Sequence, residues 1–438
     1  MKLTVVGGGS TYTPELVDGI AGRRTSLAVD EIVLVDPDVS RLEVVGAFSQ
    51  RLLKHAGHPA VVTTTTDLER GVDGASAVLL QLRVGGQAAR ASDETFPLMC
   101  DCVGQETTGA GGLAKALRTV PVVLDIAERV RAIAGEDTWI VNFTNPVGIV
   151  TRALLQAGHR AVGLCNVAIT FQRWTSALLG VHPESVRLGH VGLNHLTWET
   201  GVFVDGVDRL PELLDRHGDA LGSHIGVPAS LMRRLGMVPS YYLKYFYDHD
   251  EVVRKQKTEP PRAEVVAGVE KELLDVYGDV GVVTKPAQLS QRGGAYYSEA
   301  AVQLVHALTG GAGPGAADSE RHVVNVRNDG TLPFLPDDAV IEVPAVVDTK
   351  GASPLPVPSV PPSITGLIAH VTSYEQLALD AAVRGGRDRV ADALLAHPLI
   401  GQHSIADRLA DELVARNADF LPWAKGPAGD VHGGKGVQ

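Results

Sequence analysis

The stretch that most constrains the fold lies at the start of the chain, where a short apolar run over residues 3–6 leads directly into the three glycines 7–9. A helical pattern then opens at Pro14. A strand, a glycine-rich turn and a helix in this order are typical of dinucleotide-binding domains, because the turn's N–H groups and the helix N-terminus bind the pyrophosphate. Tyr12 occupies the third glycine position, so a tight turn without a ligand is the alternative. The expected cofactor contacts here are Gly7, Gly9, Ser10 and Thr11.

The second predicted strand, over residues 31–35, indicates which dinucleotide is bound. It ends at Asp36. A carboxylate at this position suits the ribose hydroxyls of NAD and repels the 2′-phosphate of NADP, so NAD is favoured. Arg41 follows closely enough to keep NADP open, although an arginine in the next helix is more often solvated.

Strands alternate with helices through the N-terminal part of the chain. Apolar strand patterns cover residues 78–82 and 139–146, the second ending at the Asn145-Pro146 pair, and an amphipathic helical run covers residues 113–134. This alternation predicts a Rossmann-type, doubly wound parallel sheet. Ligands of such sheets lie at the carboxyl ends of the strands, where we expect Arg83 and Asn145.

After about residue 164 the pattern changes. We predict an NAD-binding Rossmann domain over residues 1–164, and an α+β catalytic, metal-binding and oligomerisation domain over residues 165–425. A glycine-rich tail, residues 426–438, is predicted to be disordered. The patterns expected in the second part are a strand region at 189–204, helices at 210–238, 262–277, 365–384 and 386–416, and antiparallel strands at 322–326 and 339–346.

The composition excludes several kinds of partner. The 438 residues carry a net charge of −12, which argues against nucleic acid or an anionic membrane as the main partner, while a local arginine pocket can still bind a small anion. Three cysteines imply no disulfide framework. The N-terminus has no signal-peptide pattern, and no apolar run is long enough to span a bilayer. A cytoplasmic protein is expected.

Two short segments stand out beyond the dinucleotide pattern. One contains Cys165, Asn166 and Val167, and the other ends in Asn194 and His195. By themselves they mean little, because a buried cysteine is usually a small apolar core residue and a lone histidine is more often structural. A thiol and an imidazole beyond a nicotinamide site nevertheless call for a chemical explanation.

Taken together, these segments identify a family. The chain resembles the NAD- and manganese-dependent glycosidases of glycoside hydrolase family 4, which share a fold with lactate and malate dehydrogenases. Within that family it looks most similar to the 6-phospho-β-glucosidases, an assignment supported by the triplet at 165–167. It departs from their usual pattern at Ala168 and Leu82, without losing a chemical group. The matching segments are residues 6–14, 83–86, 104–119, 142–146, 165–167, 192–195 and 292–294.

The resemblance implies a redox-assisted elimination instead of the usual two-carboxylate hydrolysis. In this route C3 of the sugar is oxidised by NAD⁺, a base removes the C2 proton, and the aglycone leaves from C1. Water then adds, and C3 is reduced again. The cofactor ends each turnover in its starting state.

Residue roles follow from the same resemblance. Cys165 and His195 match the ligands of a divalent ion, and His190 is expected to be structural. A thiolate and an imidazole alone would suggest zinc, so Mn²⁺ or another divalent ion comes from the family. The base is expected to be Tyr242, with Tyr241 as the alternative, and an ordinary phenol pKa of about 10 requires nearby positive charge.

The sugar and its 6-phosphate need polar and cationic partners. Asn145 and Asn166 are expected to bind the sugar, and each arginine could instead be a surface residue. The remaining expected contacts are Arg83 and Thr107 for the cofactor, and Arg90, Arg262 and Arg292 for the phosphate.

Three other interpretations of the function remain open. The first is a dehydrogenase acting on a 2-hydroxy acid, which would produce NADH in net amounts. The second is a nucleotide-sensing regulatory protein without turnover. The third is a family 4 glycosidase of other specificity, acting on α-linked or unphosphorylated sugars. A homodimer or homotetramer is expected from the family.

Overall fold

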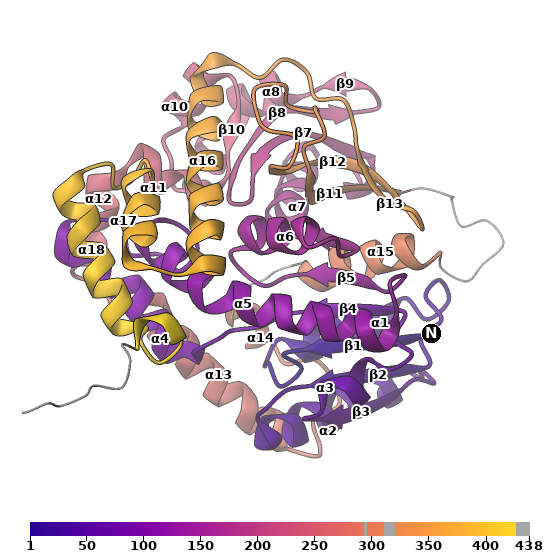
Figure 1. The fold of residues 1–438 in the computed structure, drawn as a ribbon. Coiled ribbons are helices and arrows are strands. Elements are labelled where there is room, and N and C mark those ends of the chain that lie inside the picture. Colours follow the sequence, from indigo (N-terminus) through magenta and orange to yellow (C-terminus); the bar gives the residue numbers. More distant parts are fainter. Residues whose placement is uncertain (293–295, 311–319, 426–438) are drawn as a thin grey trace, which may run out of the picture.

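The centre of the fold is a nine-stranded sheet, which Figure 1 shows between layers of helices. This computed structural model describes residues 1–292, 296–310 and 320–425. The predicted disordered tail at 426–438 and the glycines at 293–294 lie outside the described residues. The strands of the sheet are β1 (Lys2–Val6), β2 (Glu31–Val35), β3 (Val61–Thr65), β4 (Ala77–Leu80), β5 (Trp139–Asn142), β6 (Ala161–Gly163), β11 (Glu320–Arg327), β12 (Val340–Asp348) and β13 (Gly351–Pro354).

The strand order confirms the predicted Rossmann-type sheet. The first six strands are parallel and run β3-β2-β1-β4-β5-β6, the order of the doubly wound dinucleotide-binding fold. Nearly every residue of β1, β2, β4 and β5 is buried, as expected for parallel strands covered on both faces. The antiparallel strands β11, β12 and β13 extend the same sheet beyond β6.

Helices cover both faces of the parallel strands. Right-handed crossovers place α1 and α2 on one face, and α3, α5 and α6 on the other. The later helices α13 and α15 pack on the first group, and α16 packs on the second. The bounds are α1 (Thr13–Gly22), α2 (Val39–His55), α3 (Leu68–Val72), α5 (Gly109–Ala134), α6 (Val147–Gln156), α13 (Arg262–Gly278), α15 (Tyr297–Thr309) and α16 (Pro362–Arg384).

A smaller antiparallel sheet packs against β12 through β7. The predicted strand region at 189–204 is a hairpin of two strands, and the predicted helical region at 210–238 divides into three short helices. The elements are β7 (Val186–Leu193), β8 (Leu196–Val204), β9 (Val207–Asp208), β10 (Val238–Pro239), α8 (Leu210–Arg216), α9 (Gly218–Ile225) and α10 (Ala229–Leu235).

The C-terminal helices pack onto α5, at the side of the central sheet (Figure 1). The helix predicted over 386–416 is two helices, separated by a break at residues 396–402. No helix in the described ranges is both long and apolar enough to cross a bilayer. The remaining helices are α4 (Gly86–Thr95), α7 (Val167–Leu179), α11 (Lys244–Tyr247), α12 (His249–Gln256), α14 (Leu289–Arg292), α17 (Arg387–Leu395) and α18 (His403–Arg416).

Candidate active site

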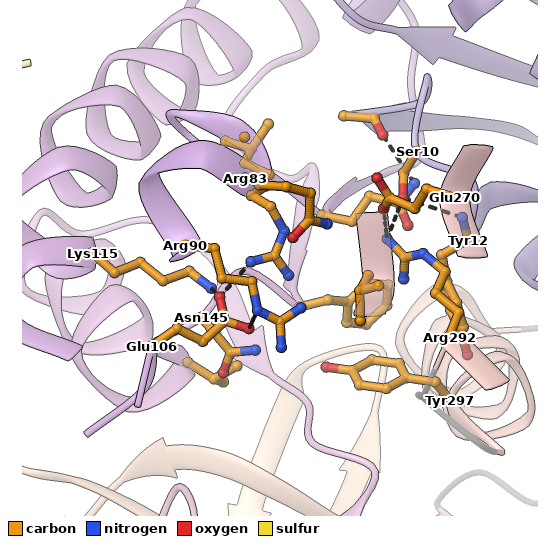
Figure 2. Close-up of a pocket in the computed structure, with 18 of the residues that line it drawn as sticks. Ser10, Tyr12, Arg83, Arg90, Glu106, Lys115, Asn145, Glu270, Arg292 and Tyr297 are labelled. Atoms are coloured by element: carbon orange, nitrogen blue, oxygen red, sulfur yellow. Dashed lines mark hydrogen bonds and ion pairs between the residues drawn. The ribbon is translucent and has the colours of Figure 1, made fainter. Parts of the chain in front are cut away.

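A cavity of about 520 Å³ opens where the carboxyl ends of β1, β4, β5 and β6 meet (Figure 2). This is the edge at which ligands of doubly wound sheets bind. Eleven of the sixteen predicted catalytic, metal-binding, cofactor-binding and substrate-binding residues line it, and they come from segments far apart in the chain. They are Gly7, Ser10, Asp36, Arg83, Arg90, Asn145, Cys165, Asn166, His195, Tyr242 and Arg292.

The glycine turn after β1 forms one wall. Gly7 has a φ of 87°, and a Cβ there would lie 2.7 Å from the carbonyl oxygen of Gln81, so the turn requires glycine. The backbone N–H of Gly9 donates to Asp36 Oδ2 (3.0 Å). Arg41 Nε donates to the Gly9 carbonyl (2.9 Å). The aspartate at the end of β2 therefore faces the cavity beside the turn, as an NAD-binding carboxylate would.

Arg292 joins the glycine turn to helix α13. Its Nε donates to Thr11 Oγ1 (2.8 Å), and its Nη2 donates to Ser10 Oγ (3.2 Å). The same Nη2 lies 3.1 Å from Glu270 Oε1. Arg292 thus lies at the end of the cavity beside the glycine turn, as Figure 2 shows.

A group of cations surrounds one buried carboxylate in the opposite part of the cavity wall (Figure 2). Glu106 accepts from Lys115 Nζ (2.6 Å) and pairs with Arg90 Nε (3.2 Å) and with Arg83. Burial by itself would raise the pKa of Glu106, but the three cations outweigh it and hold the pKa well below its ordinary value. Arg90 also pairs with Glu94 (2.7 Å). Three positive and two negative side chains leave this cluster with a charge of +1.

Cys165 and His195 lie in the same cavity at a third position. Cys165 follows β6, just before α7, and His195 occupies the turn between β7 and β8. His195 has a φ of 64°, a conformation that costs energy for a residue other than glycine and is often found at functional sites. Its ring stacks on that of Tyr242, with centroids 3.7 Å apart and planes 13° apart. Burial lowers the pKa of His195 to about 4, so the imidazole is neutral.

A buried ionic network lies next to Cys165 and His195. His190 lies between Glu199 Oε1 (2.6 Å) and Glu342 Oε1 (3.1 Å). Burial lowers the pKa of His190, but the two carboxylates outweigh it and raise that pKa to about 10. One imidazolium and two carboxylates carry a net charge of −1. Asn194 connects this network to the site, since it donates to Glu342 Oε2 (3.0 Å) and hydrogen-bonds Cys165.

The residues present fit a divalent cation. Cys165 and the neutral His195 supply sulfur and nitrogen donors, and the network behind them supplies negative charge. Asn145 Oδ1 is buried and has no hydrogen-bond partner within the described part of the chain. Burial, and then Glu342, raise the pKa of the Cys165 thiol, so binding a cation would displace its proton. The described residues contain no group of three or more His, Cys, Asp or Glu side chains arranged for a metal, so exogenous oxygens would have to complete the coordination.

Five of the sixteen predicted catalytic, metal-binding, cofactor-binding and substrate-binding residues do not line this cavity. Gly9 and Thr11 lie in the glycine turn, bonded to Asp36 and Arg292. Tyr241 packs beside Tyr242, with ring centroids 4.6 Å apart. The other two are Thr107, which contacts His195 Nδ1 (3.1 Å), and Arg262, which is exposed and donates to the Gln291 carbonyl (2.7 Å).

Sequence reasoning missed several residues of the cavity wall. Glu106 could have been found from the sequence, because it is a carboxylate inside the unusually glycine-rich segment at 104–112. Lys115 and Glu270 lie in ordinary helical patterns, and no sequence pattern marks them as cavity residues. Tyr12 and Tyr297 also line the cavity, and their rings meet edge to face with centroids 6.1 Å apart.

Two family models match the chain and together cover most of it. The family 4 glycosyl hydrolase model matches residues 2–181, and the model of the family's C-terminal domain matches residues 190–400. A protein of Bacillus subtilis (strain 168) named probable 6-phospho-beta-glucosidase is 36% identical over 440 residues, covering 96% of this chain and 97% of the relative.

Solved structures agree with these matches. The 6-phospho-beta glucosidase from Thermotoga maritima, solved with manganese, NAD⁺ and glucose-6-phosphate, superimposes with a TM-score of 0.86 at 32% identity, covering 96% of this chain and 99% of the other. Malate dehydrogenase from Salinibacter ruber superimposes with a TM-score of 0.52 at 16% identity, covering 89% and 99%. This second likeness shows the fold alone and confirms the expected dehydrogenase-like architecture. The family matches confirm the resemblance drawn from the sequence, and the chain is a glycoside hydrolase that belongs to family 4.

Proposed function

We propose that this protein hydrolyses 6-phospho-β-glucosides with the help of NAD⁺ and a divalent ion, Mn²⁺ as in the Thermotoga maritima structure. One observation carries the proposal. A single cavity contains a dinucleotide-type glycine turn with its aspartate, a thiol–imidazole pair with a tyrosine, and a cationic cluster. A dinucleotide, a metal-bound sugar and a sugar phosphate would each find suitable partners there.

Bound cofactor and metal would supply hydride transfer at C3 and polarisation of the oxygens at C2 and C3. Asp36 and the glycine turn would hold the dinucleotide. Cys165 and His195 would hold the ion, and Asn145 and Asn166 at the strand ends would orient the sugar hydroxyls.

Tyr242 is our candidate for the base that removes the C2 proton. Its ring lies against His195 and faces the cavity, whereas Tyr241 lies beside it and hydrogen-bonds to it. Burial raises the pKa of Tyr242 well above its ordinary value. A cation at Cys165 and His195 would oppose that effect by favouring the phenolate. Tyr241 is the alternative base, reached through the hydrogen bond between the two hydroxyls.

The phosphate is the part of the substrate that the cationic cluster would select. Arg90 and Arg83 face the cavity next to Lys115, and the cluster keeps a charge of +1 with both carboxylates in place. Arg292 lies at the cofactor end and fits a role there as well. Arg262 is exposed, so a contact with the phosphate would need α13 or the arginine side chain to move. Cytoplasmic location and assembly into dimers or tetramers belong to the same proposal.

The test measures release of p-nitrophenol from p-nitrophenyl β-D-glucoside 6-phosphate by protein stripped of cofactor and metal. Release that requires both NAD⁺ and Mn²⁺, without net NADH, is the expected result. Release only from the unphosphorylated or α-linked analogue would contradict the substrate assignment. If no glycoside releases p-nitrophenol and NADH accumulates steadily with a 2-hydroxy acid, the protein is instead a dehydrogenase.

A further inference from the structure

A short chain of hydrogen bonds connects His195 to the loop that precedes α5. Thr107 Oγ1 lies 3.1 Å from His195 Nδ1, and Gln105 Oε1 lies 3.2 Å from Thr107 Oγ1. Neither Gln105 nor Thr107 lines the candidate active-site cavity. Their polar groups are therefore available to act through the histidine instead of through the ligand.

The direction of each hydrogen bond can be worked out, starting from the backbone. The Thr107 N–H, which can only donate, points at one polar atom of the Gln105 side chain at 2.8 Å. That atom must therefore be the amide oxygen, and the amide nitrogen faces the Tyr245 hydroxyl at 3.2 Å. The orientation of Gln105 is fixed by a backbone donor, independently of any choice of side-chain protons.

The hydroxyl of Thr107 comes next. An amide oxygen only accepts, so the Thr107 hydroxyl must donate its one proton to Gln105 Oε1. The same hydroxyl oxygen can then only accept from His195 Nδ1. His195 Nδ1 therefore carries a proton, so Nε2 is the ring nitrogen whose lone pair can bind an ion.

The orientation of the ring is fixed at the same time. The bond to Thr107 acts in the plane of the imidazole, and the stacked Tyr242 ring fixes that plane. The supporting loop is held in turn, because Gly109 N–H donates to His397 Nε2 (3.1 Å) and Glu106 is buried among cations. A ligating histidine commonly has its second nitrogen bonded in this way, and loss of that partner typically weakens metal binding about 10- to 100-fold.

We propose that Gln105 and Thr107 are positioning residues that hold His195 in the Nδ1–H tautomer, with the Nε2 lone pair directed at the metal. This rests on the proposed function for the identity of the bound ion, but not for the tautomer. Thr107, expected from the sequence to contact the cofactor, acts instead through His195.

The first measurement is of the tautomer in the metal-free protein. Two-bond ¹H–¹⁵N correlation spectra of ¹⁵N-histidine-labelled protein, assigned with His195→Asn, should show His195 protonated on Nδ1. Thr107→Val removes the acceptor at nearly constant volume and should abolish this preference, whereas Thr107→Ser should retain it. A wild-type His195 protonated on Nε2, or an unchanged tautomer in Thr107→Val, would overturn the proposal.

The second measurement is Mn²⁺ affinity, followed by electron paramagnetic resonance of free Mn²⁺ without substrate. Thr107→Val should raise the Kd about 10- to 100-fold, and Thr107→Ser should restore it to within about threefold. Equal affinity in Thr107→Val and wild type would overturn the positioning role. Wild-type protein that shows the Nδ1–H tautomer and binds no Mn²⁺ would overturn the metal assignment, and the tautomer result keeps these two failures distinguishable.

Discussion

Replacing Glu106 by glutamine is the most informative test of the cationic cluster. Glu106 is 6% exposed and Lys115 is 3% exposed, so water can do little to solvate the positive charges that the substitution leaves unpaired. Glu106→Gln keeps the shape of the side chain but removes the anion from among Lys115, Arg83 and Arg90. Arg90 keeps its second partner Glu94 (2.7 Å). The cluster charge changes from +1 to +2.

The expected loss of stability follows from this geometry. Removing one partner of a buried ion pair costs about 3–5 kcal/mol, because the other charge stays buried without compensation. Burial lowers the pKa of Lys115, and Glu106 partly opposes that effect. Without Glu106 the pKa of Lys115 falls further, and the lysine can escape the penalty by losing its proton. The difference in stability between wild type and variant should therefore shrink as the pH rises from 6 to 8.

The free energy of unfolding would be measured by urea titration at pH 6 and pH 8, followed by circular dichroism. Glu69→Gln is the matched control, since Glu69 pairs with Arg129 (2.8 Å) at the surface, where both side chains are at least 40% exposed. A surface pair of this kind contributes about 0–1 kcal/mol. The reasoning is refuted if Glu106→Gln costs no more than Glu69→Gln at pH 6.

The remaining predictions concern the metal, the phosphate and a buried carboxyl. Cys165→Ser should abolish Mn²⁺-dependent turnover, while the Kd for NAD⁺ stays within about threefold. The control variant Cys100→Ser should behave as wild type. Wild-type turnover in Cys165→Ser would show that the thiolate is not a metal ligand. Arg90→Ala should raise KM for the phosphorylated glucoside about 10- to 100-fold, with Arg129→Ala as the neutral control; an unchanged KM would place the phosphate elsewhere. Burial raises the pKa of Glu375 from 4.5 to about 8, so the folded state keeps a proton that the unfolded state releases. Stability should fall by up to about 1.4 kcal/mol per pH unit between pH 4.5 and 8, and Glu375→Gln should remove this slope; parallel thermal-denaturation profiles would contradict the assignment.

The N-terminal half of the fold could be predicted because its signals are local. The glycine turn, the aspartate after β2 and the apolar strands each depend on residues close in sequence. The continuation of the sheet by β11 could not be predicted, since Asn325 pairs with Gly163 across a long stretch of chain. A strand pattern in the sequence does not indicate which edge of the sheet the strand will join.

The site could be predicted only in part, for the same reason. Cys165 and His195 drew attention as motifs, but their shared role came from the family resemblance and not from their spacing. The enclosure of Glu106 by three cations depends on how α4 and α5 pack, and no sequence pattern reports that. The Thr107 contact with His195 likewise joins two segments 88 residues apart.

The central claim, that the glycosidic bond breaks by elimination after loss of the C2 proton, is tested most directly by running the reaction in D₂O. The glucose 6-phosphate formed with NAD⁺ and Mn²⁺ would be analysed by ¹H NMR and mass spectrometry. The account predicts deuterium at C2, because the proton removed by the base is replaced from solvent. Product that keeps its C2 proton, formed equally well without NAD⁺, would contradict it and establish direct displacement at C1.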